Sequence, residues 1–184
     1  MKPTEILMQE HDILLRVLDA AAREVQFMDE TGTMHEETIE RMVDFIRNFA
    51  DRCHHAKEEK RLFVFMREHG MPANGGPIAV MLHDHETGRE FVRWVTKGLE
   101  MARAGDAAGV QTVRQNLAGY IGLLRMHIHK ENNILFPMAA RMMTPEDEAR
   151  LLAEFEQVEA EEVGEGVHKK YHQLAHELTQ GVTP

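Results

Sequence analysis

The feature that most constrains the fold is a motif that occurs twice: His-x-x-x-Glu followed by a short apolar segment. The first copy is His54–Glu58 within CHHAKEEKRLF, and the second is His127–Glu131 within HIHKENNILFP. The copies lie 73 residues apart, and a Leu-Phe pair follows each at the same offset. Because residues four apart share one face of an α-helix, each copy predicts an imidazole and a carboxylate that point in one direction. One such motif is weak evidence, but its repetition in register indicates an internal duplication.

Size and composition restrict the classes to which the protein can belong. A chain of 184 residues, 43% hydrophobic and 28% charged, favours one domain with a sizeable core. Its net charge of −10 argues against nucleic acid as a partner. The sequence has no apolar run long enough to span a membrane, no signal-peptide core at its start and one cysteine, which permits no intrachain disulfide. We therefore expect a cytoplasmic protein without a membrane or nucleic-acid partner.

Apolar residues recur at helical spacing along most of the chain, and no stretch alternates as a strand would. Four long helices are expected, over about residues 4–28, 36–69, 78–104 and 107–142. The strongest break between them is GMPANGGP, which is rich in glycine and proline. Long helices joined by short loops favour an all-α, up-down-up-down four-helix bundle, which we assign to residues 1–143.

We predict a C-terminal helical extension over residues 144–184 that packs on this bundle. Thr144 followed by Pro145 is typical of a helix start. The last short helix carries three histidines on one face: His168, His172 and His176. Glu165-x-x-His168 has the spacing of metal ligands, but glycines on both sides of Glu165 weaken a helix there. We therefore expect this segment to cover the bundle or shield one end of its site rather than bind a second metal.

The first and third helices each add a histidine to an apolar face. His11 lies in the first apolar stripe with acidic residues on either side. In the third helix His83 and His85 compete, because residues two apart point about 200° away from each other. His85 also has acidic neighbours and lies 74 residues after His11, close to the spacing of the other repeat. We therefore favour His85, with His83 as the alternative.

Folding the apolar stripes together brings six polar side chains to one level of the bundle. They are His11, His54, Glu58, His85, His127 and Glu131. Two charged carboxylates buried side by side repel, at a cost on the order of several kcal/mol, which two divalent cations would remove. Glutamates can bridge such cations about 3.5–4 Å apart, and six ligands leave positions open for a small molecule. Imidazole and carboxylate without thiolate suit iron or manganese, with zinc as an alternative.

The pattern EHD, HxxxEExxLF, DHExGR and HxxxENxxLFP resembles the hemerythrin-like family, also called HHE cation-binding domains. The match covers roughly residues 4–140 and recurs in all four expected bundle helices. The resemblance implies a non-haem di-iron centre, with two iron ions bound by the six residues named above. The segment FEQVEAEEVGEGVHKKYHQLAHEL also resembles an extension seen on bacterial members.

The motifs differ from those of the oxygen-carrying members, which use five histidines, a His-x-x-x-His pair and a final His-x-x-x-x-Asp. Here one histidine of the third helix faces the core, and Asn132 stands where the aspartate would fall. Four histidines with two glutamates are closer to the bacterial di-iron repair and nitric-oxide-response members. The leading hypothesis is a di-iron protein that binds or reacts with O2, NO or a peroxide. Several alternatives stay open for the activity: an oxidase, a peroxidase or an NO-reacting protein, an iron store or donor, an iron–sulfur repair protein, or a metal-stabilised interaction module. The chain could also form a homodimer.

Four further side chains have less specific interpretations. His55 and His129 adjoin the expected ligands but lie off the apolar stripe, so we expect them to contact ligands or to lie at the surface. Cys53 is expected to be a small buried residue. Tyr120 lies two turns before the second motif; we expect it to pack in the core, with a hydroxyl directed at the metals as the alternative.

Overall fold

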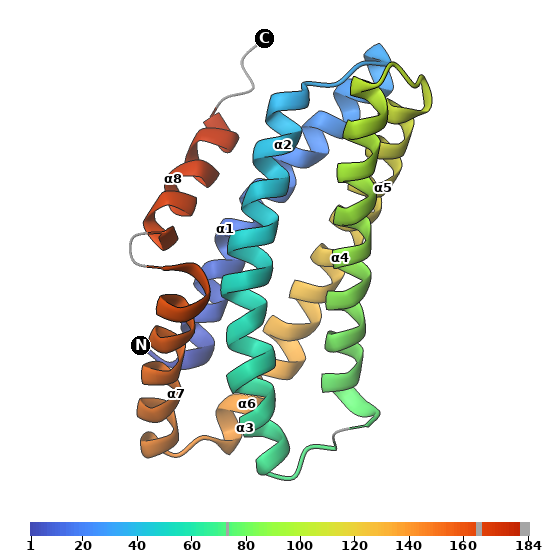
Figure 1. Ribbon diagram of the computed structural model, residues 1–184. Helices are drawn as coiled ribbons and strands as arrows, with labels where there is room; N and C mark the ends of the chain where they lie inside the picture. Colours follow the sequence, from blue (N-terminus) through green and yellow to red (C-terminus); the bar gives the residue numbers. More distant parts are fainter. Residues whose placement is uncertain (73, 165–166, 181–184) are drawn as a thin grey trace.

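The protein is described by a computed structural model of residues 1–72, 74–164 and 167–180, which form helices and no strand. The predicted all-α class is confirmed. Long helices lie side by side along one axis (Figure 1). The segments, with η for a π-helical turn, are α1 (Pro3–Thr31), α2 (Glu36–Phe45), η1 (Ile46–His55), η2 (Glu58–Leu62), α3 (Phe63–Glu68), α4 (Gly76–Arg103), α5 (Ala108–Lys130), η3 (Glu131–Leu135), α6 (Phe136–Met142), α7 (Pro145–Val158), η4 (Glu159–Val163) and α8 (Val167–Gln180).

Several of these segments continue directly into one another and form longer rods. Residues 36–68 run through α2, η1, η2 and α3 without a loop, and residues 108–142 run through α5, η3 and α6. These rods match the helices expected at 36–69 and 107–142 to within one residue at each end. The first helix extends three residues beyond the expected end and stops at Gly32, whose φ of 69° is the left-handed conformation typical of a helix C-terminus.

Both copies of the repeated motif lie at π-helical turns. The turn η1 ends at His55, η2 begins at Glu58, and η3 begins at Glu131. Hydrogen bonds from i to i+5 place more residues in each turn than the 3.6 of an α-helix, so neighbouring side chains diverge less. Such turns are frequent at functional sites, and here they change which residues face the interior.

The core consists of two apolar clusters separated by a polar level. One cluster includes Leu18 and Phe45, and the other includes Leu7, Phe63 and Phe136. Along each rod, the predicted ligands fall in sequence between residues of the two clusters. The polar level is therefore enclosed by apolar packing on both sides along the rods.

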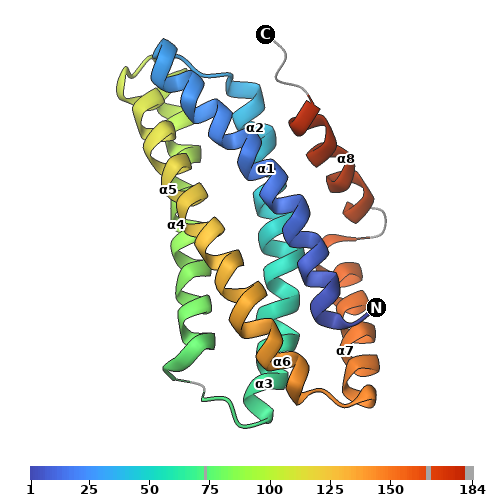
Figure 2. The same cartoon turned by 180° about the vertical axis from the view of Figure 1, so that it is seen from behind.

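The helices after α6 lie along α1 and α2 (Figure 2). The helix α7 begins with the expected cap, in which the Thr144 hydroxyl accepts a hydrogen bond from the Asp147 backbone N–H. Phe155 of α7 joins the apolar cluster of Leu7, and the Tyr171 hydroxyl of α8 donates to an Asp44 carboxylate oxygen at 3.1 Å. Among the described helices, none combines the length and the apolar character needed to cross a membrane.

The histidines of α8 do not form a metal site within the described part of the chain. Neither His172 nor His176 belongs to a group of closely spaced ligand atoms there. Both instead line a pocket between α1 and α8. The predicted Glu165–His168 pair lies outside the residues whose side chains are described.

Candidate metal centre

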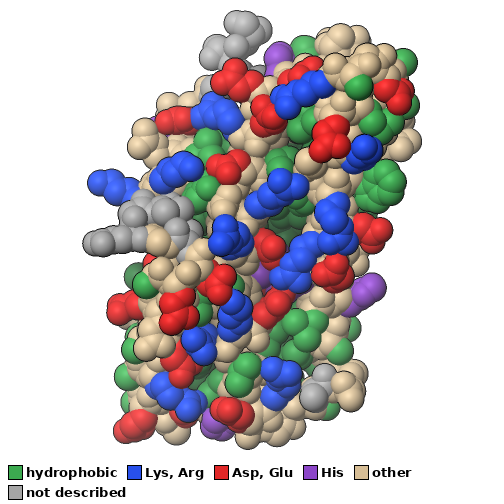
Figure 3. Space-filling model, viewed as in Figure 1, with side chains coloured by type: hydrophobic (Ala, Val, Ile, Leu, Met, Phe, Trp, Pro, Cys, Tyr) green, Lys and Arg blue, Asp and Glu red, His purple; other side chains and the backbone are tan. Residues whose placement is uncertain are grey.

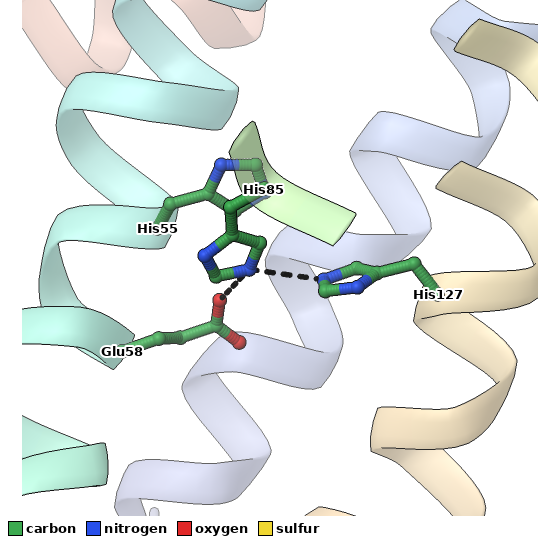
Figure 4. Close-up of side chains that lie close together, drawn as sticks. All are labelled: His55, Glu58, His85 and His127. Atoms are coloured by element: carbon green, nitrogen blue, oxygen red, sulfur yellow. Dashed lines mark hydrogen bonds and ion pairs between the residues drawn. The ribbon is translucent and has the colours of Figure 1, made fainter. Parts of the chain in front are cut away.

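The six side chains predicted as ligands converge in the interior, and each is at most 2% exposed. Their ligand atoms fall into two groups, in each of which all atoms lie within 4.8 Å of one another. One group is His11, His54, Glu58 and Glu131, and the other is His55, Glu58, His85 and His127. Figure 4 shows the second group, in which Glu58, His85 and His127 point toward one another and His55 lies against His85. These groups have the composition and the spacing to hold metal ions.

Glu58 connects the two groups. Its Oε1 lies 3.5 Å from Nε2 of His54, and its Oε2 lies 3.4 Å from Nε2 of His85. The two oxygens of one carboxylate thus face histidines from different rods. This is the arrangement that a bridging carboxylate requires.

Glu131 occupies the equivalent position in the second copy of the motif. Its Oε2 lies 3.3 Å from Nε2 of His11 and 3.1 Å from Nε2 of His127. Each glutamate therefore contacts one histidine of its own rod, four residues earlier, and one histidine of another rod. One oxygen of Glu131 thus lies close to histidines of two rods.

Each predicted histidine is oriented by an acceptor on its other ring nitrogen. The Nδ1 contacts are His11 to Asn132 at 2.7 Å, His54 to Glu10 at 2.8 Å, His85 to Glu59 at 2.7 Å and His127 to Asp84 at 3.3 Å. An Nδ1–H that donates to such an acceptor leaves the lone pair on Nε2. All four rings turn Nε2 toward the glutamates, and contacts of this kind on the other ring nitrogen orient metal-binding histidines. Nε2 of His85 and Nε2 of His127 lie 3.1 Å apart, so one of these two nitrogens donates a hydrogen bond to the other in the absence of metal.

The outer contacts obey the same internal duplication as the ligands. Glu10 and Asp84 each precede a histidine in the sequence, yet each binds the histidine of the following rod. Lys57 and Lys130, which are 73 residues apart, form ion pairs with these two carboxylates. The residues directly after the two glutamates complete the pattern by binding the histidines of α1 and α4. The acidic neighbours were noted in the sequence, but their partners are seen only in the fold.

Several buried atoms of the centre have no hydrogen bond within the described structure. They are Nε2 of His11 and His54 and both carboxylate oxygens of Glu58 and Glu131. The contacts of 3.1–3.5 Å described above are close but lack hydrogen-bond geometry. Nearly all buried polar atoms in proteins have a partner, so lone pairs directed at one shared volume need another explanation. Divalent cations fit this donor set, because imidazole and carboxylate are both metal ligands.

The surroundings shift the pKa values of the two carboxylates in opposite directions. Burial and the neighbouring Glu131 raise the pKa of Glu58 well above its usual range. Burial alone would also raise the pKa of Glu131, but His127 and His11 outweigh it and lower that pKa well below its usual range. For His127, Glu131 and Asp84 overcome the effect of burial and raise the pKa to about 9. Without cations the centre therefore retains protons that a metal ion would displace.

His55 is the residue that the sequence interpretation underestimated. It is 5% exposed, its ring stacks on His85 with centroids 3.9 Å apart, and Asp51 Oδ1 lies 3.5 Å from its Nδ1. Of the two expectations for His55, contact with a predicted ligand is confirmed by this stacking, whereas a surface position is wrong, because the π-helical turn η1 brings two consecutive histidines into the interior. The signal in the sequence was the His-His pair, which a regular helix would have split between two faces.

The other sequence alternatives are resolved by burial. His83 and His129 are exposed, whereas His85 is 2% exposed. Cys53 is buried, as expected. Tyr120 is 3% exposed and packs in the core, and within the described structure its hydroxyl has no hydrogen-bond partner.

Comparisons with known proteins agree with this geometry. The family model described as the hemerythrin HHE cation binding domain matches residues 2–139. The protein Rv1995 of Mycobacterium tuberculosis is 24% identical over 161 residues, which cover 88% of this chain and 62% of the relative. The iron-sulfur cluster repair protein YtfE of Pectobacterium atrosepticum is 39% identical over 92 residues, covering 48% of this chain and 41% of the relative.

The repair protein YtfE of Edwardsiella ictaluri is 28% identical over 134 residues, covering 71% of this chain and 60% of the relative. The matched region thus spans less than two thirds of the length of each of these relatives. No solved structure matches the chain significantly.

Proposed function

The chain belongs to the hemerythrin HHE cation-binding family, and from this premise we propose that it holds a dinuclear non-haem iron centre that binds or reacts with O2, NO or a peroxide. The proposed ligands are His11, His54, His85 and His127, one pair for each ion, with Glu58 and Glu131 as bridges. In this proposal α1, α2–α3, α4 and α5–α6 correspond to the up-down-up-down four-helix bundle expected from the sequence. The observation that carries the proposal is the set of buried, unbonded Nε2 and carboxylate atoms that share one volume.

Bound iron would supply redox chemistry and coordination positions that the protein side chains leave open. The protein residues supply position and charge. Four acceptors hold the imidazoles so that Nε2 faces inward: Glu10, Glu59, Asp84 and Asn132. The apolar clusters limit the access of water along the rods. Manganese or zinc would suit the same donors, so the identity of the metal has to be measured.

The direct test is iron loading of the untagged protein without oxygen, followed by metal analysis and absorption spectra. We expect two iron ions per chain and new absorption bands after addition of O2, NO or H2O2. His54→Ala and Glu131→Ala should each lower the iron content below two, while His83→Ala, which changes an exposed histidine on α4, should retain both ions. Full occupancy in both ligand variants, or spectra that respond to none of the three molecules, would contradict the proposal.

Iron donation for cluster repair is a second candidate, favoured by the relatives named iron-sulfur cluster repair protein YtfE. In this case occupancy and release matter more than turnover. Iron-loaded protein would then pass iron to an apo acceptor protein faster than a chelator alone removes it. Iron that stays bound in the presence of the acceptor would exclude donation and leave the small-molecule proposal unaffected.

A further inference from the structure

A cavity of about 330 Å³ leads from the surface to one end of the centre. Buried His55, His85 and His127 line its inner part, and the exposed side chains of Arg47 and Arg93 line its outer part. A water molecule accounts for about 30 Å³ of liquid volume, whereas sites for organic ligands begin at about 300 Å³. The cavity is therefore about ten times larger than O2 or NO needs.

Two residues that line this cavity, Gly88 and His55, are not repeated in the other half of the duplicated sequence. The positions that match Gly88 and His55 in the repeat are Leu14 and Ile128, and both are 2% exposed core residues. Large apolar side chains thus stand at the corresponding positions near the other histidines. At Gly88 the missing side chain leaves a space whose nearest atoms belong to Tyr120, 3.5 Å from the point where a Cβ would lie. The sequence departs from its own repeat where the cavity lies.

Polar atoms at the inner end of the cavity form no hydrogen bond in the described structure. Both ring nitrogens of His55 and the hydroxyl of Tyr120 are buried without a hydrogen bond. Burial also raises the pKa of Tyr120, so its hydroxyl stays neutral and can donate. Together with the apolar walls formed by Val92 and Leu124, these atoms would suit a ligand with an apolar body and few polar groups.

The outer part of the cavity is positively charged although the chain carries a net charge of −10. Arg89 is held by Asp51 and Glu59, but Arg47 and Arg52 form no ion pair with a described acidic side chain. Arg47 instead donates to the Thr96 hydroxyl. Figure 3 shows Lys and Arg side chains along the seam between α2–η1 and α4 on this face. Guanidinium groups in such a position are suited to bind a carboxylate.

We propose that this cavity binds a small organic carboxylate with an apolar body the size of a phenylalkyl group. The carboxylate faces Arg47 and Arg52, and the apolar body extends past Gly88 toward His55 and Tyr120. That this ligand is a substrate of the centre rests on the function proposed above, whereas its binding is a separate property that can be measured without metal.

Calorimetric titration of the full chain with 4-phenylbutyrate tests the proposal in both the metal-free and the iron-loaded form. We expect one binding site in each form, with 4-phenylbutanamide at least tenfold weaker because it lacks the charge. The double variant Arg47→Gln/Arg52→Gln should weaken binding at least fivefold, and Gly88→Val should abolish it by filling the cavity. Matched controls on α5 are Arg125→Gln, whose arginine pairs with Asp19, and Gly122→Val, where a Cβ would meet no atom within 4 Å. Both controls should bind as the parent protein does.

Three outcomes would overturn the proposal: no binding of 4-phenylbutyrate at millimolar concentration in either form, equal affinity for the amide, or binding that Gly88→Val leaves intact. The response of the metal centre to O2, NO or peroxide is tested independently of carboxylate binding. A centre that responds to O2, NO or peroxide in a protein that binds no carboxylate would refute the cavity assignment alone. Carboxylate binding beside a centre that responds to none of them would refute the proposed function alone.

Discussion

Lys57 offers a quantitative test of how the polar level of the core is stabilised. Its side chain is 0% exposed and forms ion pairs with Glu10, 3% exposed, and with Glu159 of η4. Burial alone would lower the pKa of Lys57, but Glu10 and the other neighbours raise it, so the lysine remains charged at neutral pH. Glu10 also holds Nδ1 of His54. Lys57→Met therefore leaves a buried carboxylate without its cation while preserving most of the side-chain volume.

Removal of one partner from a buried ion pair costs about 3–5 kcal/mol, and we expect Lys57→Met to lower the free energy of unfolding by this amount. The internal duplication provides a matched control. Lys130 pairs with Asp84 at the equivalent position, but its side chain is 32% exposed. For such a partly solvated pair we expect Lys130→Met to cost about 1 kcal/mol or less.

The assay is urea unfolding of the metal-free protein, followed by circular dichroism. With a slope of about 2–3 kcal/mol/M, Lys57→Met should lower the midpoint by more than about 1 M, and Lys130→Met by less than about 0.5 M. Adding Glu10→Gln to Lys57→Met should recover part of the loss, because the unpaired charge is then removed. Equal effects of the two lysine variants would refute the argument from burial.

Two further predictions follow from the pKa values and from the close packing of α4 against α5. Burial and Glu131 raise the pKa of Glu58, and His127, whose pKa is raised to about 9, carries a proton at pH 7 in the metal-free centre. Metal binding should release at least the proton of His127, so that affinity falls about tenfold or more per unit of decreasing pH between pH 8 and 6; chelator competition at several pH values measures this, and a pH-independent affinity would contradict it. On α5, a Cβ at Gly109 would lie 2.4 Å from the backbone nitrogen of Ala102 on α4, whereas one at Gly122 would meet no atom within 4 Å. Thermal or urea unfolding should show that Gly109→Ala destabilises by about 1–3 kcal/mol and that Gly122→Ala stabilises by about 0.5–1 kcal/mol, and the reverse order would show that α4 and α5 are not packed so closely.

Apolar residues at helical spacing predicted the long helices, and this spacing together with the repeat selected the six residues that converge in the core. His54 and Glu58 lie four residues apart, so the geometry of a single helix places both side chains on one face. The preference for His85 over His83 also followed from local geometry, because positions two apart point in nearly opposite directions. Which side chains share a face of a helix depends only on residues of that helix. Because the motif is repeated, this inference could be made independently for each copy.

The contacts between rods were decided by the tertiary structure alone. Glu10 was expected only as an acidic neighbour of His11, but it binds His54 and Lys57 on another rod. The relative rotation and axial offset of two packed helices determine such pairs, and neither is encoded in a local pattern. His55 became an interior residue because the chain adopts a π-helical turn, which the assumption of 3.6 residues per turn cannot predict. The cavity beside Gly88 likewise exists only because side chains from several rods surround a position that has none.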